Sequence, residues 1–182
     1  DNSVSHILTN ERNKLDEIRS SKYIYSLTDE LFPEVKKQLK AGNKVLVCGA
    51  PCQISGLYTF LKKDYENLIT CDFICKSVNS TKVFQKYIEW LESKYKSKAK
   101  KIKAKDKTTG WHRFSMRVDF ENGKSYVADR YNDPFFVGYL QTELFTMEAC
   151  FNCQFRGFPR PADITLADFW GIENVDKSMD QD

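Results

Sequence analysis

Two consecutive strand–turn–helix units constrain the fold more than any other feature of the sequence. Residues 44–48 (KVLVC) form a compact apolar run of the buried-strand type, and a helix with apolar residues at helical spacing follows from about residue 52. Residues 68–74 form a second such run, and a helix over residues 80–95 follows it. This strand–helix–strand–helix order predicts parallel strands joined by right-handed crossovers.

The flanking segments add shorter elements. Ahead of the two units, the pattern predicts a helix over residues 10–20, a strand over 22–27 and a helix from about residue 31 that Gly42 ends. Behind them, alternation over residues 114–120, the turn dipeptide Asn122-Gly123 and a return over 126–129 predict a β-hairpin. A helix over residues 133–145 and a strand over 163–169 complete the expected order.

We therefore expect one α/β domain over residues 1–182, with a parallel or mixed sheet, flanking helices and an antiparallel β-hairpin extension. Its strand/helix half spans residues 1–98, and its hairpin and Cys-x-x-Cys half spans residues 99–182. The sequence starts at Asp1 rather than at Met, which suggests a fragment of a longer protein.

Composition excludes several classes of protein. The 182 residues are 41% hydrophobic and carry a net charge of +3, which fits a globular domain rather than a disordered chain. Apolar runs are too short for a membrane span, and no signal peptide is present, so we expect a cytoplasmic protein. Residues 94–107 hold eight lysines, but Ile102 and Ala104 alternate with them as on a solvated strand, and we expect no nucleic-acid partner.

Six cysteines fall in three pairs along the chain. Cys52 opens a helix after the first strand, where the helix dipole and free amide donors are expected to lower the thiol pKa. Cys75 occupies the equivalent place after the second strand, and the carboxyl ends of neighbouring parallel strands face the same crevice. Cys48 and Cys71 lie within the strands and are predicted to belong to the core.

Cys150 and Cys153 form a Cys-x-x-Cys pair. Two sulfurs at this spacing can bind one ion or cluster, and Cys52 and Cys75 are available to complete a four-thiolate site. Such a set suits zinc as well as an iron–sulfur cluster, and Cys150 and Cys153 alone could instead form a redox disulfide.

Five blocks of the sequence, in order, resemble the coenzyme F-420 hydrogenase/dehydrogenase beta-subunit family. The family patterns are GSKYVQS, GTPCQIAGL, DLICHGVPS, RDKxxGW and CxxCxF…ADITLGDFWGI. The matching segments here are SSKYIYS at 20–26, CGAPCQISGL at 48–57, DFICKSVNS at 72–80, KDKTTGW at 105–111 and the stretch 150–172. The resemblance covers residues 4–173.

The resemblance implies an iron–sulfur flavoprotein oxidoreductase that relays electrons between a 4Fe–4S cluster, FAD and a deazaflavin-like or unknown acceptor. It implies a small redox substrate, and a redox partner protein or a ferredoxin-like segment of the same chain. The cysteines in the matching blocks are the four selected by position, so the expected metal ligands are Cys52, Cys75, Cys150 and Cys153.

Four residues in the matching blocks are candidate flavin contacts, although the resemblance does not imply that the fragment retains FAD. They are Lys22, Tyr23, Gly49 and Gln53. A lysine can stabilise a reduced anionic flavin and a tyrosine can stack on the ring, while a structural role at a strand end is the alternative for Lys22 and Tyr23.

The sequence departs from the family pattern in two places. Residues 76–79 read KSVN where the family has HGVP, which replaces a titrating histidine by a fixed cation. Lys105 stands where the family has arginine, which keeps the charge but loses bidentate phosphate geometry.

Two other functions compete with electron transfer. One is a non-catalytic module that binds zinc or no metal and docks a partner in polysaccharide biosynthesis. The other is a thiol–disulfide oxidoreductase that uses Cys150 and Cys153. The sequence assigns no catalytic residue, and it leaves open whether the chain is an enzyme.

Overall fold

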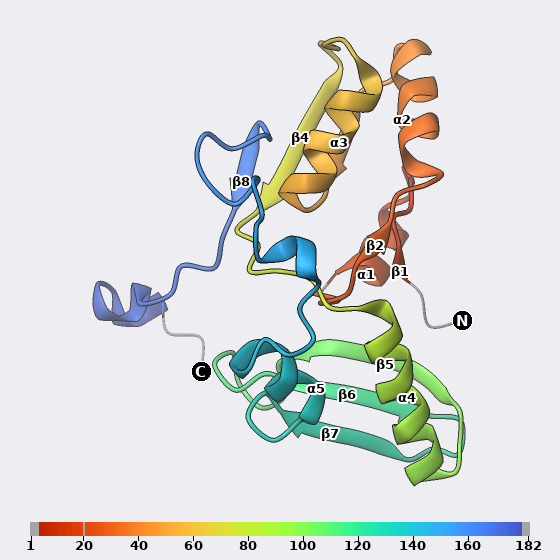
Figure 1. Cartoon of the computed structure of the whole chain (residues 1–182), viewed down its shortest axis with the longest axis vertical. Helices are drawn as coiled ribbons and strands as arrows, with labels where there is room; N and C mark the ends of the chain where they lie inside the picture. The colour runs from red at the N-terminus through yellow and green to blue at the C-terminus, as the bar shows by residue number, and fades with distance from the viewer. Residues whose placement is uncertain (1–3, 20, 180–182) are drawn as a thin grey trace.

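The computed structural model describes residues 4–19 and 21–179. Figure 1 shows a parallel sheet with two helices at one end of the molecule and an antiparallel sheet with one long helix at the other. The mixed α/β architecture with an antiparallel extension is therefore confirmed.

The parallel sheet has the strand order β3-β4-β8. Its strands are β3 (Val45–Cys48), β4 (Leu68–Phe73) and β8 (Ile164–Leu166), all parallel. Helices α2 (Leu31–Lys40) and α3 (Pro51–Leu61) pack on one face of β3. Their apolar faces and the inward residues of the strand form one hydrophobic cluster, made of Leu31, Val35, Leu39, Val45, Val47, Ile54, Leu57 and Leu61.

The opposite face of this sheet is open to solvent. Leu46, at 60% exposure, pairs laterally with Ile69, and Phe73 pairs with Leu166 on the same face. The sequence predicted strands buried on both faces, and this was wrong for β3, which alternates between buried and exposed residues because α2 and α3 cover one face. Cys48 is consequently exposed rather than in the core, whereas the core position of Cys71 is confirmed at 7% exposure.

The antiparallel sheet has the strand order β5-β6-β7. Strands β6 (Ser115–Phe120) and β7 (Ser125–Asp129) are the predicted hairpin, and the lysine-rich β5 (Ala99–Asp106) adds an edge strand. Helix α4 (Thr81–Tyr95) lies across the sheet (Figure 1) and buries Phe84, Ile88 and Leu91 against it. This second hydrophobic cluster shares no residue with the first.

The segments ahead of α2 are shorter than the sequence predicts. The expected helix is a single 3-10 turn, η1 (Arg12–Lys14), followed by α1 (Leu15–Ile18), and the expected strand is β2 (Ser26–Leu27), which pairs in parallel with β1 (Val4–Ser5). Residue 20, where the expected helix ended, lies outside the described residues.

The predicted helix over residues 133–145 is wrong in its second part. Helix α5 (Pro134–Phe136) passes into a π-helical segment, η2 (Val137–Gln141), and the helix stops there. Glu143 has a left-handed backbone with φ 57°, where the chain turns back, and the Phe145 ring then packs against the backbone at Gly138.

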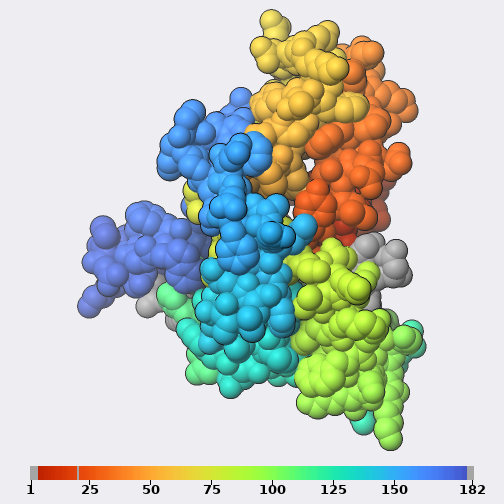
Figure 2. All heavy atoms as spheres, viewed as in Figure 1, coloured from red at the N-terminus to blue at the C-terminus, as the bar shows by residue number. Residues whose placement is uncertain are grey.

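Three single 3-10 turns complete the chain. They are η3 (Glu148–Cys150), η4 (Ile172–Asn174) and η5 (Lys177–Met179). The last two lie in the dark-blue segment that projects from the body of the molecule in Figure 2. Among the described residues, none of the helices has the length and apolar character that crossing a membrane requires.

Candidate metal centre

The expected ligands Cys52 and Cys75 emerge from the carboxyl ends of neighbouring parallel strands. Cys52 is the second residue of α3, which begins three residues after β3 ends, and Cys75 follows two residues after β4. The Cys48–Cys71 register pair and the hydrogen bond from Gly49 N to Cys71 O, at 3.0 Å, place the two strand ends side by side. The parallel topology therefore brings together two thiols that 23 positions separate.

The loop with Cys150 and Cys153 lies against the same edge of the sheet. Cys150 ends the turn η3, where its N–H donates to Met147 O at 2.9 Å. In Figure 1 this blue segment runs between the parallel sheet and the antiparallel sheet. Arg156 Nη1 donates to Lys76 O at 3.4 Å, which ties the loop to the residue after Cys75.

The charges of the other three candidate thiols act on Cys75. Burial raises the pKa of Cys75 to about 11, and the charges of Cys52, Cys150 and Cys153 add to this effect, while Arg156 opposes it. Burial also raises the pKa of Cys52, with Cys153 as the next cause and Cys150 as a further one. The four thiols thus come from three chain segments, and the charges of these thiols raise the pKa values of Cys52 and Cys75.

The pKa of Cys52 is raised, whereas the sequence predicted that the helix start would lower it. Hydrogen bonds from the amides of residues 52 and 53 do lower the pKa of this thiol, as a helix start should, but burial and the neighbouring thiols outweigh them. Thiols that raise one another's pKa favour a bound cationic centre, which would stabilise all the thiolates together. The chemistry of the donor set therefore fits a four-thiolate metal group, although no three His, Cys, Asp or Glu side chains within the described ranges are spaced to hold a single metal ion.

A buried ion pair fixes the cysteine loop to β4. Arg160 Nη2 lies 3.0 Å from Asp72 Oδ2, and the two side chains are 7% and 0% exposed. The same guanidinium donates from Nη1 to Arg156 O at 2.9 Å and Phe155 O at 3.4 Å, and from Nη2 to Phe73 O at 3.0 Å. One side chain thus joins the backbone that follows Cys153 to the strand that leads to Cys75.

Two of the predicted flavin contacts, Gly49 and Gln53, lie together at the start of α3. Gln53 Oε1 accepts from Ala50 N at 3.0 Å, and Gln53 Nε2 donates to Ser26 O at 2.7 Å. A Cβ on Gly49 would lie 3.3 Å from Gln53 Oε1 and 3.5 Å from His6 Nε2. Both residues have close protein neighbours, and the hydrogen bond from Gln53 to Ser26 links β2 to α3, the helix that carries Cys52.

The other two, Lys22 and Tyr23, precede β2. Lys22 Nζ donates to the carbonyls of Ile18 and Arg19, both at 2.8 Å, at the end of α1, and burial lowers its pKa. Tyr23 has a left-handed backbone with φ 54°, and its ring centroid lies 5.7 Å from that of Tyr139.

Tyr139 connects the thiols to Tyr23. Burial raises the pKa of Tyr139 to about 12, and the charges of Cys75, Tyr23 and Cys150 raise it further, while Ser77 lowers it. Its hydroxyl donates to Ser77 O at 2.7 Å. Sequence reasoning missed the aromatic chain from the cysteines through Tyr139 to Tyr23, because nothing in the local pattern marks Tyr139.

A known family matches most of the chain. This family is described as the C terminus of the coenzyme F420 hydrogenase/dehydrogenase beta subunit, and it matches residues 42–181, a range that includes all four cysteines. The chain belongs to this family. No curated protein matches the sequence.

Among solved structures, a chain of the F420-reducing [NiFe] hydrogenase complex from Methanosarcina barkeri is similar. The identity is 19% and the TM-score is 0.43, over 74% of this chain and 43% of that chain. This chain therefore spans less than half the length of its structural neighbour.

Beyond the cysteines, two blocks that resemble this beta-subunit family meet in space. Lys105 Nζ pairs with Asp168 Oδ2 at 3.2 Å, and the Trp111 and Trp170 ring centroids are 4.3 Å apart. Lys105 Nζ also lies 5.5 Å from the Trp111 ring centroid. Local sequence pattern does not reveal the contact between Lys105 and Asp168, because 63 positions separate the two residues.

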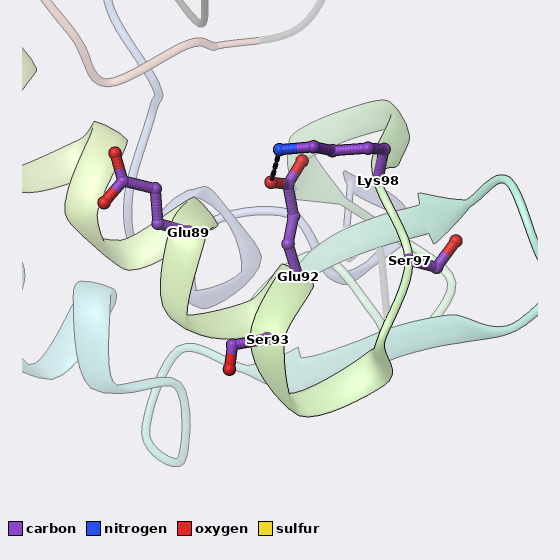
Figure 3. A pocket seen from close by; sticks show the side chains of 5 residues that line it. All are labelled: Glu89, Glu92, Ser93, Ser97 and Lys98. Carbon is purple, nitrogen blue, oxygen red and sulfur yellow. Dashed lines mark hydrogen bonds and ion pairs between the residues drawn. The ribbon is translucent and has the colours of Figure 1, made fainter.

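A shallow hollow on α4 lies outside this centre. Figure 3 shows that Glu89, Glu92, Ser93, Ser97 and Lys98 line it, and the Glu92–Lys98 ion pair at 2.7 Å closes one side. Glu92 and Lys98 pair with each other, Glu89 pairs with Lys86 outside the hollow, and we assign the hollow no function.

Proposed function

We propose that the chain is the electron-relay part of an iron–sulfur flavoprotein oxidoreductase. Cys52, Cys75, Cys150 and Cys153 would hold a 4Fe–4S cluster, which supplies one-electron chemistry when bound. A flavin would exchange two electrons with a deazaflavin-like or other small redox substrate. A redox partner protein, or a ferredoxin-like segment of the same polypeptide, would supply or accept the single electrons.

The mutual effect of these cysteines on their pKa values supports this proposal most directly. They come from three chain segments, and after burial the charges of Cys52, Cys150 and Cys153 raise the pKa of Cys75. Membership in a family of F420 hydrogenase/dehydrogenase beta subunits supports redox chemistry as the use of such a site. A purely structural core would not require thiols at four positions on one sheet edge.

The aromatic contacts support a place for the flavin beside the thiols. Tyr23 lies next to Tyr139, whose pKa responds to the charges of Cys75 and Cys150. We propose that Tyr23 and Lys22 contact the flavin ring, and that Gly49 and Gln53 shape the same site from the start of α3. The hydrogen bonds of Gln53 to Ala50 and Ser26 would then hold β2 and α3 in place around the ligand.

Metal content tests the ligand set. Iron, acid-labile sulfide and zinc are measured per chain after anaerobic purification, in the wild type and in the Cys52→Ser and Cys153→Ser variants. We expect about four irons and four sulfides in the wild type and a loss of most iron in both variants, because a 4Fe–4S cluster needs its four thiolates.

Cys48→Ser is the matched control, since Cys48 lies four positions from Cys52 but on the exposed sheet face. We expect it to keep the iron of the wild type. One zinc per chain would contradict the relay and favour the partner-docking module. Loss of iron in Cys48→Ser equal to that in Cys52→Ser would contradict the assigned ligands.

Flavin binding is tested separately by FAD titration of the reconstituted protein, followed by fluorescence quenching. We expect Tyr23→Ala to weaken FAD binding by at least about fivefold, because a base-stacking aromatic contributes about 1–3 kcal/mol. Tyr131→Ala, an exposed tyrosine on the antiparallel side, is the control and should bind FAD as the wild type does. Equal affinity of both variants would remove Tyr23 from the flavin site.

A further inference from the structure

Two cysteines outside the proposed ligand set lie directly opposite each other. Cys48 ends β3 and pairs in register with Cys71 of β4, and both side chains lie on the sheet face that α2 and α3 leave uncovered. Cys48 is exposed, while Cys71 is 7% exposed. The Cys48 thiol is therefore accessible to a reagent in solvent, and the buried Cys71 thiol lies next to it.

The backbone brings these two residues within reach of a covalent link. Neighbouring strands lie about 4.8 Å apart, and the Cα atoms of disulfide-linked cysteines are usually about 4.4–6.8 Å apart. The hydrogen bond from Gly49 N to Cys71 O, at 3.0 Å, fixes the register immediately after Cys48. The two thiols also sense each other, since burial, the charge of Cys71 and a hydrogen bond with Cys71 raise the pKa of Cys48.

We propose that Cys48 and Cys71 form a cross-strand dithiol that a low-molecular-weight disulfide, such as oxidised glutathione, converts to a disulfide. The Cys48 thiolate, formed by loss of its proton, attacks one sulfur of the small disulfide and expels a small thiolate. The Cys71 thiolate, formed likewise, then attacks the Cys48 sulfur of the mixed disulfide and expels the second small thiolate. The two protons pass to the small thiolates, so the protein loses two electrons and the small disulfide becomes two thiols.

Sheet geometry makes this link easy to reverse. Side chains at paired positions of parallel strands stand side by side, so their Cβ atoms stay near the strand spacing, whereas a relaxed disulfide has Cβ atoms about 3.5–4.5 Å apart. The bond would form under strain, and strained disulfides are the readily reduced ones. It would join the two strands whose ends lead to Cys52 and Cys75.

Peptide mapping tests the proposal without reference to metal or flavin. The full chain is treated with oxidised glutathione, free thiols are alkylated, and the protein is digested with trypsin. Cleavage after lysine gives peptides 45–62 and 64–76, which contain Cys48 with Cys52 and Cys71 with Cys75, respectively. A linked peptide pair alone therefore does not identify the bond, and the cysteine variants must do so.

We expect the linked pair to form in the Cys52→Ser/Cys75→Ser double variant, to be absent from the Cys48→Ser/Cys71→Ser double variant, and to disappear on treatment with dithiothreitol. Fragmentation of the wild-type linked pair locates the bond even if a variant fails to fold. Fragments that join residues 48 and 71 would support the proposal. A link that joins residues 52 and 75, or no linked pair after oxidation, would overturn it.

Discussion

At the scale of single residues, a buried carboxylate, Asp133, connects several elements by hydrogen bonds. Asp133 is fully buried and its carboxylate accepts from Tyr87 Oη at 2.6 Å, Tyr126 Oη at 2.9 Å and Phe136 N at 2.9 Å. It thereby caps α5 and joins α4 to β7. The sequence marked this residue as a helix start, but its two tyrosine partners are 46 and 7 positions away and could not be read from local pattern.

Removal of this carboxylate should destabilise the antiparallel unit. We expect Asp133→Ala to lower the free energy of unfolding by about 3 kcal/mol, because it leaves buried hydroxyls and a helix-start amide without an acceptor. Asp133→Asn keeps an acceptor and should lose less. Urea unfolding followed by circular dichroism measures both, and equal losses would contradict the bonding scheme.

The same residue predicts a pH dependence. Burial raises the pKa of Asp133 above its ordinary 3.8, although its hydrogen bonds oppose this. Its contribution to stability is therefore fully present below pH 3.8 and is lost as the pH rises through the folded-state pKa. The difference in unfolding free energy between wild type and Asp133→Asn should move against the wild type over that rise, and a difference that is flat with pH would contradict the shift.

At the scale of elements, two glycines in helical segments have opposite environments. A Cβ on Gly56 in α3 would lie at an ordinary 3.6 Å from the Phe32 ring, whereas a Cβ on Gly138 in η2 would overlap the Phe145 ring. The predicted helix over residues 133–145 extended too far, because local propensity does not record the turn at Glu143 that brings the Phe145 ring onto the backbone of η2.

These glycines give a paired prediction. We expect Gly56→Ala to raise the free energy of unfolding by about 0.8 kcal/mol, since alanine is the better helix former and the space is free. Gly138→Ala should lower it by about 1–3 kcal/mol through overpacking. Thermal unfolding of both variants checks the signs, and a stabilised Gly138→Ala would show that Phe145 does not pack there.

Arg160 holds two elements together at the metal centre. It pairs with Asp72 in β4 and donates to carbonyls of the loop after Cys153. The sequence could predict the Cys-x-x-Cys loop from its spacing, but not which side chain would fix it, because an arginine in a loop is ordinarily solvated. Atoms Asp72 Oδ2 and Arg160 Nε lack hydrogen-bond partners among the described residues, so the pair depends on charge.

Loss of this arginine should therefore be costly. We expect Arg160→Met to lower the free energy of unfolding by about 3–5 kcal/mol, because it leaves the buried Asp72 carboxylate unpaired. Arg156→Met, which removes one exposed contact to Lys76 O, should change it by less than about 0.5 kcal/mol. Limited proteolysis between residues 150 and 160 reports the loop directly, and wild-type resistance in Arg160→Met would contradict its role.

At the scale of the whole molecule, each of the two three-stranded sheets has its own hydrophobic cluster. The blue segment with the cysteine loop runs between these two sheets in Figure 1. The strand–helix order sufficed to predict the parallel sheet, and the alternation with the Asn122-Gly123 turn sufficed to predict the hairpin. The set of four cysteine ligands stays a prediction. These sequence patterns did not predict the open face with Leu46 and Cys48, because an apolar strand is read as buried on both faces whether or not a second layer is present.

The central claim is that Cys52, Cys75, Cys150 and Cys153 bind one cluster that cycles by a single electron. The most direct measurement is the EPR spectrum of the anaerobically reconstituted protein after dithionite reduction, integrated against its iron content. We predict a signal from a reduced cluster that integrates to about one spin per four irons, as for a single 4Fe–4S centre. Iron-free protein after reconstitution, or bound iron that gives no reducible cluster signal, would contradict the account.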